Sequence, residues 1–319
     1  MTGRLRVAVI GGGRNCEHEV SLASAASAYA ALDRDRYQPV ALTIGRDGGW
    51  LVDGRAADLL AAIAVLRGCD VVLPLVHGVR GEDGSLAALC EFAGVPYVGS
   101  GVGAGALGMD KWATKLVAAS VGVATAPGYL VSGADEPGRP WTGPVVVKPV
   151  RAGSSHGVAL VADRAALSPA VAAALRPGDR VLVEQVVAGR EIDIAVLGSP
   201  AGPPVVSPAL EIAVDGVFDY AAKYGGGAEF RVPARLPGYR RRELAEQAVA
   251  VYQALGCAGV ARVDFFLTAD GWVFNEVNTA PGLTEQSQVP RMFAAAGLGY
   301  SQLLDRMIVT ALAGPGDRW

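Results

Sequence analysis

The most informative part of this chain is the segment Gly259-Val-Ala-Arg-Val-Asp-Phe-Phe-Leu-Thr-Ala-Asp-Gly-Trp-Val-Phe-Asn-Glu-Val-Asn-Thr-Ala-Pro-Gly282. Side chains alternate between the two faces of a strand, and this segment alternates on both sides of a turn that ends in glycine. We predict strands at Val260–Leu267 and Trp272–Val277. They are joined by the three-residue loop Ala269–Gly271, with Gly271 in the left-handed conformation.

The predicted hairpin sets two carboxylates against each other. Its loop length implies the pairs Thr268 with Trp272, Asp264 with Glu276, and Arg262 with Asn278. Directly opposed carboxylates repel each other, and a divalent cation between them removes the repulsion. Oxygen ligands from Asp, Glu and Asn suit Mg²⁺, so Asp264, Glu276 and Asn278 form the predicted metal site. The alternative is a solvated polar face on an ordinary hairpin, and the apolar residues assigned to the other face fit both interpretations (Val263, Phe265, Val273 and Val277).

The composition indicates a soluble α/β protein of two or three domains. The chain has 319 residues, of which 51% are hydrophobic, with 42 glycines and a formal net charge of −3. No cluster of Lys and Arg offers a footprint for a phosphate backbone, so we expect no nucleic-acid partner. The four cysteines are far apart and are predicted to be reduced, mostly buried thiols (Cys16, Cys69, Cys90 and Cys257). The three scattered histidines make a His-based metal site improbable (His18, His77 and His156).

The sequence gives no sign of a membrane protein. The chain starts with a strand and shows no apolar core of a signal peptide. Two long uncharged stretches, Phe92–Met109 and Leu116–Ala134, are interrupted by Gly, Ser and Pro. We therefore expect a cytoplasmic protein without membrane contacts.

The element pattern divides the chain into three units, at 1–102, 103–187 and 188–319. The first alternates strands (Val7–Ile10, Pro39–Ile44, Val71–Leu75 and Pro96–Val98) with helices (Ser21–Leu32, Ala56–Leu66 and Ser85–Phe92), which predicts a parallel sheet. The second has helices Asp110–Ser120 and Ala165–Leu175 and strands Val145–Lys148, Val158–Val161 and Arg180–Val187. The third has strands Ile192–Leu197 and Val205–Ile212, a helix that buries Leu244, Ala248, Val251, Tyr252 and Leu255, the hairpin, and helix Ser301–Ala313.

Two glycine-rich segments are candidates for phosphate binding, since no P-loop motif occurs. Gly103-Ala-Gly-Ala-Leu-Gly108 matches the dinucleotide fingerprint, but no acidic residue follows about 20 positions later to bind a ribose. We therefore favour a turn with close helix packing there. The better candidate is Lys148-Pro-Val-Arg-Ala-Gly-Ser-Ser-His-Gly157, in which a strand-end lysine precedes a loop rich in N–H groups and hydroxyls. The alternative is an ordinary hairpin loop.

A further pair of carboxylates follows. Glu184 interrupts the apolar run Val183–Val187, and Glu191 comes shortly after. A carboxylate at such a buried edge can accept hydrogen bonds from an adenine amino group or a ribose hydroxyl.

Together these parts resemble an ATP-grasp enzyme, and more narrowly the D-alanine–D-alanine ligase family, over nearly the whole chain. The matching segments are Gly12–Ser21, His77–Gly84, Gly99–Gly101, Met109–Lys111, Lys148–Gly157, Asp219–Tyr224 and Leu255–Gly282. The resemblance implies an α/β protein with the ATP-grasp fold, in which an N-terminal parallel α/β domain precedes two α+β domains that clasp ATP. It also implies the reaction: ATP phosphorylates the carboxylate of one D-amino acid, and the amine of a second then attacks the acyl phosphate.

The resemblance assigns roles to particular residues. ATP-binding residues would be Lys111, Lys148, Ser154, Ser155, Glu184, Val187, Glu191 and Lys223, and two Mg²⁺, or Mn²⁺, would be held by Asp264, Glu276 and Asn278. Glu17, Ser154, Tyr224, Arg262 and Gly282 would be catalytic, with Arg262 and the Gly282 N–H stabilising an oxyanion. The substrates, D-amino acids, would be bound by Glu17, His77, Gly282, Ser287 and Gln288. The family also implies a homodimer and a role in peptidoglycan precursor synthesis.

Three rival interpretations differ in class. One is an NAD-dependent dehydrogenase that uses Gly103–Gly108, and another is an ATP-binding protein without catalysis. The third is a ligase with another acceptor, such as D-Ser or D-Lac. Tyr224 directly after Lys223, and a loop Gly225–Val232 without histidine, favour an amine acceptor in the resemblance. Gln288 departs from the leucine usual in dipeptide ligases, and its amide either contacts a polar acceptor or points to solvent.

Two flexible segments are predicted to close over the site. Ser154–Gly157 and Lys223–Phe230 are rich in Ser and Gly, and closure would keep water from an acyl phosphate.

Overall fold

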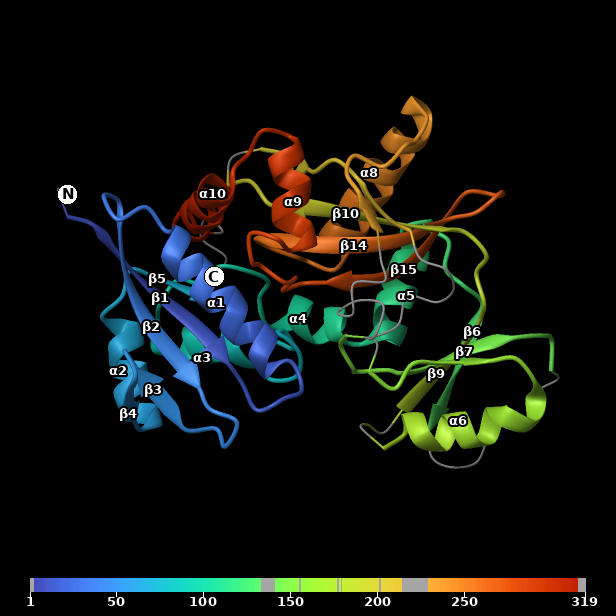
Figure 1. Cartoon of the computed structure of the whole chain (residues 1–319), viewed down its shortest axis with the longest axis horizontal. Helices are drawn as coiled ribbons and strands as arrows, with labels where there is room; N and C mark the ends of the chain where they lie inside the picture. Colours follow the sequence, from blue (N-terminus) through green and yellow to red (C-terminus); the bar gives the residue numbers. More distant parts are fainter. Residues whose placement is uncertain are drawn as a thin grey trace.

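The fold contains three sheets that are linked by helices (Figure 1). The structure is a computed structural model that describes residues 3–132, 141–154, 156–176, 178, 180–200, 202–213 and 229–314. The strand orders are β4-β3-β2-β1-β5, β6-β9-β7-β8 and β13-β12-β10-β14-β15, and β11 pairs with β10. No helix within these residues combines the length and apolarity needed to cross a membrane.

The first sheet has the predicted parallel core. β1 (Leu5–Gly12) lies between β2 (Tyr37–Ile44) and β5 (Val71–Pro74) and is parallel to both. The surrounding elements are α1 (His18–Ala31), α2 (Leu59–Arg67), α3 (Ser85–Ala93) and a small antiparallel hairpin, β3 (Trp50–Val52) and β4 (Arg55–Ala57). Sequence analysis missed this hairpin and began α2 too early. Instead of the predicted strand at 96–98, a single parallel bridge joins Val72 to Tyr97.

The second sheet is antiparallel and has a core of valines. It consists of β6 (Gly128–Ser132), β7 (Val145–Pro149), β8 (Ala159–Val161) and β9 (Arg180–Gln185), and α6 (Leu167–Ala174) packs against it after the short 3-10 helix η1 (Arg164–Ala166). The strand β6 was not predicted. It pairs with β9, so that β9 lies between β6 and β7 and is covered on both edges.

The third sheet is the largest and packs one face against helices. Its strands are β10 (Arg190–Leu197), β11 (Val205–Val206), β12 (Leu210–Ala213), β13 (Glu229–Arg231), β14 (Val260–Leu267) and β15 (Trp272–Asn278). The predicted strand at 205–212 is therefore two short strands. Helix α8 (Gly238–Ala254) buries the predicted residues Leu244, Ala248, Val251 and Tyr252 against this face, together with α5 (Lys111–Ser120).

The β14–β15 hairpin contains both predicted side-chain pairs. Asp264 lies opposite Glu276, and Arg262 lies opposite Asn278. All four side chains are therefore on one face of the third sheet, because residues two apart in a strand share a face.

The turn of this hairpin differs from the prediction. Leu267, not Thr268, pairs with Trp272, and the Thr268 backbone N–H and hydroxyl donate to the Gly271 carbonyl at 2.9 and 3.0 Å. The turn is thus one residue longer than expected, and a β-bulge that leaves Asn275 unpaired restores the register before the carboxylate pair.

The bulge also changes which β15 residues face the core. Val273 was predicted on the apolar face, but Trp272 and Phe274 are buried there instead. Their rings contact Phe265 edge-on, at centroid distances of 6.2 and 5.8 Å.

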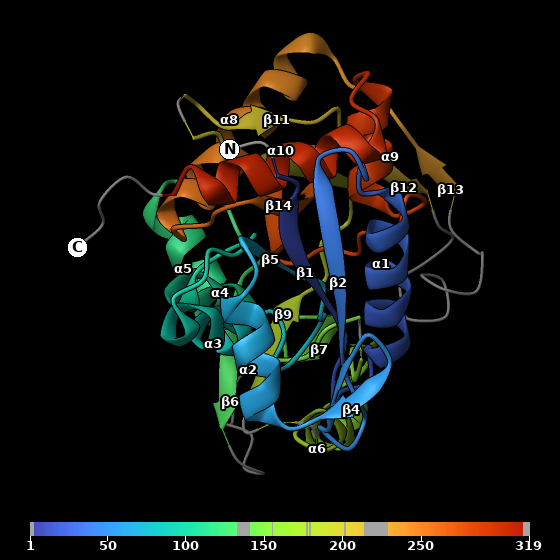
Figure 2. The ribbon, with the colours of Figure 1, turned by 90° about the vertical axis from the view of Figure 1, so that its left-hand side faces the viewer.

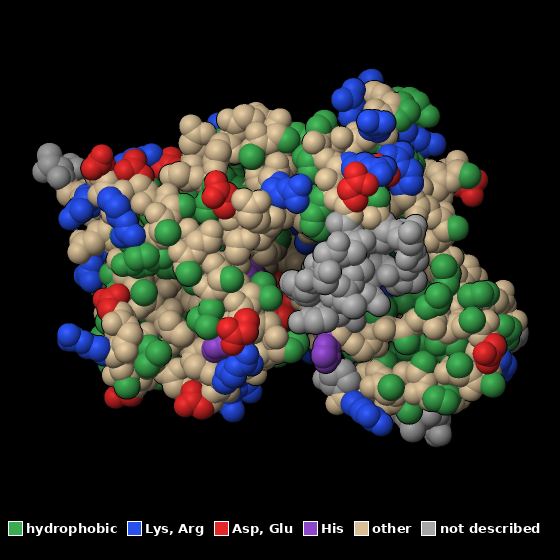
Figure 3. Space-filling view, in the orientation of Figure 1, with side chains coloured by type: hydrophobic (Ala, Val, Ile, Leu, Met, Phe, Trp, Pro, Cys, Tyr) green, Lys and Arg blue, Asp and Glu red, His purple; other side chains and the backbone are tan. Residues whose placement is uncertain are grey.

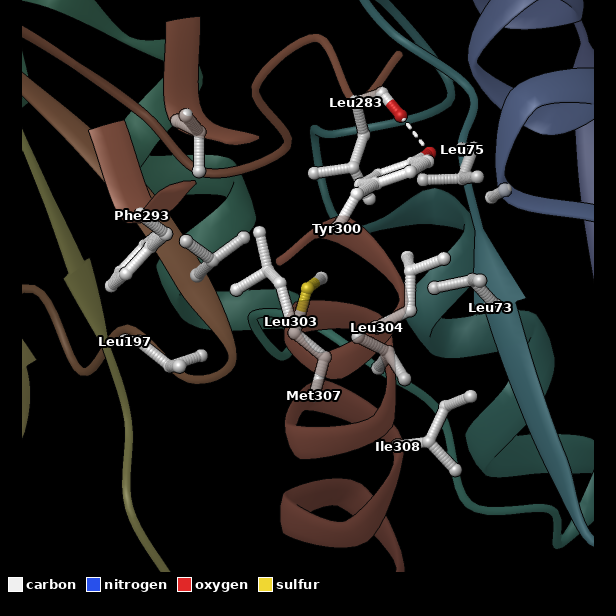
Figure 4. Close-up of a cluster of buried hydrophobic side chains, with 14 of the residues drawn as sticks. Leu73, Leu75, Leu197, Leu283, Phe293, Tyr300, Leu303, Leu304, Met307 and Ile308 are labelled. Carbon is white, nitrogen blue, oxygen red and sulfur yellow. Dashed lines mark hydrogen bonds between the residues drawn. The ribbon is translucent and has the colours of Figure 1, made fainter. Parts of the chain in front are cut away.

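The C-terminal helices pack against the N-terminal sheet. Helices α9 (Gln288–Ala295) and α10 (Tyr300–Leu312) share one apolar core with β1 and β5. Figure 4 shows Leu303, Leu304 and Met307 of α10 inside this core, and the Tyr300 hydroxyl donates to the Leu283 carbonyl. The view in Figure 2 shows α10 lying across one end of the strands of the first sheet.

The dinucleotide-like glycines lie inside a helix. Helix α4 (Val102–Met109) contains all of Gly103–Gly108, so the predicted turn is wrong. The predicted close packing is present, because a Cβ on Gly105 would lie 2.7 Å from the Gly84 nitrogen. A dinucleotide fingerprint requires a turn between strand and helix, so this segment gives no basis for NAD binding.

The cysteines form no disulfide. All four are free thiols, as predicted, but only Cys69 and Cys90 are buried, whereas Cys257 is half-buried and Cys16 is exposed.

Candidate active site

A cavity of about 270 Å³ gathers most of the predicted site residues. It lies where the Gly-rich turn after β1, the loop after β7, and the β14–β15 hairpin meet, and Figure 3 shows a hollow on this face of the molecule. The predicted residues that line it are Glu17, His77, Lys111, Ser154, Arg262, Glu276, Asn278, Gly282, Ser287 and Gln288.

One end of the cavity is formed by a buried carboxylate, Glu17. It precedes α1, directly after the turn that follows β1, and its Oε1 accepts a hydrogen bond from the Ser154 hydroxyl. A Cβ on Gly78 or on Gly153 would approach its Oε2 to 2.5 or 2.6 Å, so both glycines permit its position. Ser154 has a positive φ of 50°, which is uncommon for a side chain of this kind. Two residues predicted to be catalytic are therefore in direct contact.

Residues 280–285 of the loop after β15 leave one backbone N–H available at the cavity. The N–H groups of Ala280, Leu283, Thr284 and Glu285 donate to Asn278 Oδ1, Ser24 Oγ, Ser287 Oγ and Ser27 Oγ, respectively. Pro281 has none. Within the described residues the Gly282 N–H has no intramolecular partner, and Gly282 lines the cavity. It is therefore available to a ligand oxygen.

His77 supports this loop from behind. Its Nδ1 lies 2.8 Å from the Ala280 carbonyl and its Nε2 lies 2.9 Å from the Ser24 hydroxyl. Because a carbonyl only accepts, Nδ1 carries the proton, and in the neutral ring Nε2 accepts from Ser24. Ser24 in turn accepts from the Leu283 N–H at 3.2 Å. The histidine thus holds both sides of Gly282.

We expect Ser24→Ala to lower both stability and activity. Ser24 is fully buried, and its loss removes the partner that His77 and the Leu283 N–H share. Each buried polar group left unsatisfied costs about 1–3 kcal/mol, which urea unfolding measures. Ser120→Ala is the matched control, because that hydroxyl donates only to the Val117 carbonyl of its own exposed helix end. Equal unfolding curves for the two variants would contradict the role of Ser24.

Arg262 is the central cation of the third sheet. Its Nε and Nη2 donate to the two oxygens of Asp264, both at 2.7 Å, and its Nη1 donates to Gln288 Oε1 at 2.5 Å. Burial would lower the pKa of Arg262, but Asp264 and Asp193 outweigh it and raise its pKa. The guanidinium is therefore charged and fixed.

Carboxylates outnumber cations beside the predicted metal ligands. Lys111 Nζ lies 3.4 Å from Glu276 Oε2. Burial, and then the charges of Asp264 and Glu276, raise the pKa of Glu191 to about 7. The excess of negative charge and the all-oxygen donor set of Asp264, Glu276 and Asn278 fit a divalent cation. No set of three or more His, Cys, Asp or Glu forms a metal cluster within the described residues, so the fit depends on Asn278 as a ligand.

Gln288 does not point to solvent. It begins α9 and is only 9% exposed. Its Nε2 donates to Asp193 Oδ2 at 2.9 Å, while its Oε1 accepts from Arg262. Both ends of the amide therefore have partners in the protein.

A second group of charges surrounds Glu184 on β9. Its Oε1 pairs with Lys148 and its Oε2 pairs with Lys115 Nζ at 2.6 Å, and Lys148 also donates to Asn275 at 3.1 Å. Burial would raise the pKa of Glu184, but Lys148 and Lys115 outweigh it and lower its pKa. Sequence analysis missed Lys115, although its spacing of four residues from Lys111 places both on one side of α5.

We expect Lys115→Met to destabilise the protein. Both side chains of the Lys115–Glu184 pair are almost fully buried, and removal of one partner from such a pair costs about 3–5 kcal/mol. Lys148 still pairs with Glu184, so the loss of unfolding free energy measured by thermal unfolding should be near the lower end of that range. Arg46→Met is the control, because its ion pair with Glu19 is exposed. A cost as small as that of the control would contradict the interpretation.

The remaining predicted residues lie beside the cavity or outside the described chain. Lys148 is on β7 and Glu191 is on β10. Asp264 is buried on β14, and Val187 lies half-buried between β9 and β10. Ser155, Lys223 and Tyr224 lie outside the described residues. Of the two segments predicted to close, the first lacks only Ser155, and the second lacks residues 223–228.

Two family models match the chain. The model described as D-ala D-ala ligase N-terminus matches residues 6–64 and 57–100, and the model described as D-ala D-ala ligase C-terminus matches residues 139–309. A D-alanine–D-alanine ligase from Nocardia farcinica is 43% identical, and the match covers 98% of each protein.

Solved structures of similar proteins cover the chain equally well. The VanG D-Ala:D-Ser ligase from Enterococcus faecalis has a TM-score of 0.83 at 31% identity, over 97% of this chain and 100% of its own. The D-alanine–D-alanine ligase from Bacillus anthracis, complexed with ATP, has a TM-score of 0.81 at 27% identity, over 97% of both chains.

Proposed function

The chain belongs to the D-alanine–D-alanine ligase family, and from this premise we propose that it joins two D-alanine molecules into D-alanyl-D-alanine while it converts ATP to ADP and phosphate. The observation that carries the proposal is the cavity in which the Glu17 carboxylate, the Arg262 guanidinium and the Gly282 N–H meet. These are an anion for an ammonium group and two donors for an oxyanion.

The nucleotide would lie between the second and third sheets. Lys111 and Lys148 offer cations to its phosphates, and Glu184 and Glu191 offer acceptors to its adenine and ribose. The Bacillus anthracis relative, whose structure is complexed with ATP, supports the use of ATP. We assign Ser155, Val187 and Lys223 to the same site from the family resemblance.

Asp264, Glu276 and Asn278 would hold two Mg²⁺. When bound, Mg²⁺ neutralises charge on the transferring phosphoryl group. The negative excess around Glu191 supports a cation at this place.

The reaction then proceeds in two steps. Glu17, held by Ser154, binds the ammonium of the first D-alanine and orients its carboxylate, which attacks the terminal phosphorus as ADP leaves. In the second step the amine of the other D-alanine attacks the acyl carbon, loses a proton, and displaces phosphate. Arg262 and the Gly282 N–H would stabilise the oxyanion of that step. Tyr224 is assigned to the Glu17–Ser154 pair by resemblance.

The acceptor would bind at the start of α9. Ser287 precedes this helix and offers a hydroxyl to the acceptor carboxylate, which the helix N-terminus also favours. The amide of Gln288 is engaged by Asp193 and Arg262, so its contacts give no support to recognition of a polar acceptor side chain. D-alanine is therefore the proposed acceptor, with D-Ser, D-Lac or another D-amino acid as the alternative.

Product analysis tests this function. Purified enzyme with ATP and Mg²⁺ is given D-Ala alone, or D-Ala with D-Ser or D-lactate, and products are identified by mass spectrometry. We expect D-alanyl-D-alanine to dominate at neutral and higher pH, where more acceptor amine is deprotonated. A depsipeptide as the main product at neutral pH would contradict the proposal.

The biological setting follows from the same family. We propose three domains, 1–102, 103–187 and 188–319, supported by the three separate sheets. The dipeptide would serve peptidoglycan precursor synthesis in the cytoplasm, where ATP is available.

We also propose a homodimer, supported by the exposed apolar residues Leu60 and Phe92 on the adjacent helices α2 and α3, at 76% and 94% exposure.

A further inference from the structure

Two buried carboxylates compete for Arg262. Asp193 on β10 lies directly opposite Asp264 on β14, and the two are 0% and 2% exposed. Arg262 makes a two-pronged pair with Asp264 at 2.7 Å, whereas its Nε is 3.5 Å from Asp193 Oδ2. The Arg262 guanidinium therefore has two anionic neighbours, but its short hydrogen bonds are to Asp264.

Gln288 connects the competing groups. Its amide N–H donates to Asp193 and its amide oxygen accepts from Arg262. The reverse orientation would place the NH₂ group against the guanidinium and the oxygen against the carboxylate, so the charges fix the amide as it stands. Gln288 thus supplies Asp193 with a neutral donor and fixes the third nitrogen of Arg262.

We propose that Gln288 is a positioning residue, which engages the competing carboxylate of Asp193 and thereby holds the Arg262 guanidinium on Asp264, with its remaining N–H groups aimed into the cavity. The consequence for rate rests on the proposed function, because Arg262 acts there on the oxyanion. An apolar side chain at 288 would remove the amide donor from Asp193, and among the described residues Arg262 Nε lies 3.5 Å from its carboxylate. The guanidinium would then move toward Asp193 and away from its productive orientation.

A double-mutant cycle separates this role from simple packing. Gln288→Met keeps the length of the side chain and removes the amide, and Asp193→Asn removes the competing charge at constant shape. Gln288→Met alone should lower kcat for dipeptide synthesis by about 10- to 100-fold, as is usual for partners that orient an active group. In the Asp193→Asn background the same change should cost only about twofold, because Arg262 has no second carboxylate to move toward.

The partial reaction gives a further readout. The rate of acyl phosphate formation from ATP and one D-alanine can be measured by positional isotope exchange. In Gln288→Met this rate should fall less than the rate of dipeptide synthesis, because it is the second step that depends on the oxyanion donors. Equal losses from Gln288→Met in both backgrounds would indicate packing alone and overturn the proposal. Asp193→Ser replaces Asp193→Asn should the latter fail to fold.

One measurement is independent of the reaction. The NMR signal of the Arg262 Nε–H reports its bond to Asp264. It should shift in Gln288→Met and return toward the wild-type position in the double variant, and an unchanged signal in Gln288→Met would also overturn the proposal. Failure of the wild-type enzyme to make any dipeptide would contradict the proposed function and leave this signal as the test of Gln288.

Discussion

Glu276→Gln is expected to lower dipeptide synthesis by on the order of 10³-fold, because a bound metal supplies several kcal/mol of charge stabilisation and each 1.36 kcal/mol is tenfold in rate. The substitution keeps the size of the side chain but removes one of the two carboxylates that face each other across β14 and β15. Phosphate release with saturating D-alanine, measured across a Mg²⁺ titration, gives the change.

The fold should survive this substitution. The Glu276 side chain is 34% exposed, and its ion pair with Lys111 is long at 3.4 Å, so thermal unfolding should change little. Glu243→Gln is the matched control, since Glu243 lies on α8 and pairs only with the half-exposed Arg240. Full activity of Glu276→Gln, or of the wild-type enzyme in excess chelator, would refute the metal site.

Arg262→Lys should lower kcat by about 10²–10³-fold, the usual effect of losing an oxyanion donor. Lysine keeps the positive charge that Asp193 and Asp264 require, but it cannot reproduce the two parallel bonds to Asp264 or the third bond to Gln288. The charge should preserve the folded state, so circular dichroism and thermal unfolding accompany the kinetic measurement.

An arginine on α8 provides the comparison for this variant. Arg240→Lys alters a half-exposed residue whose Nη1 donates to Glu243 Oε2 at 3.0 Å, and its kcat should equal that of the wild type. A kcat of Arg262→Lys within a few-fold of that of the control corresponds to a difference in activation free energy of about one kcal/mol or less. Such a result would show that the guanidinium shape is not needed.

The sequence alone was sufficient for the elements whose signal is local. The alternation of strands and helices predicted the parallel arrangement of β1, β2 and β5, because each unit of that pattern lies within a short part of the chain. The opposition of Asp264 and Glu276 was also predicted correctly. That success depended on two compensating features, since the turn is one residue longer than expected and the bulge at Asn275 restores the pairing.

The bulge illustrates what local pattern does not contain. Its position depends on how β15 packs, with Trp272 and Phe274 buried against Phe265 and the Asn275 amide oxygen accepting from Lys148 of the second sheet. The predicted alternation placed Val273 on the buried face, because it assumed a strand without a bulge. One of these neighbours, Lys148, is 127 residues away from Asn275 in the sequence.

The site divides in the same way. Glu17, Arg262 and Gly282 were assigned to the site from the family resemblance, and all three line one cavity. The surroundings of Gln288 were not predictable, since Asp193 is 95 positions earlier and meets it only when α9 packs onto the third sheet. Side-chain direction in a strand repeats every two residues, so the face of each residue can be inferred from the order of residues along the chain. The partner of a buried polar group depends instead on which distant segments pack around it.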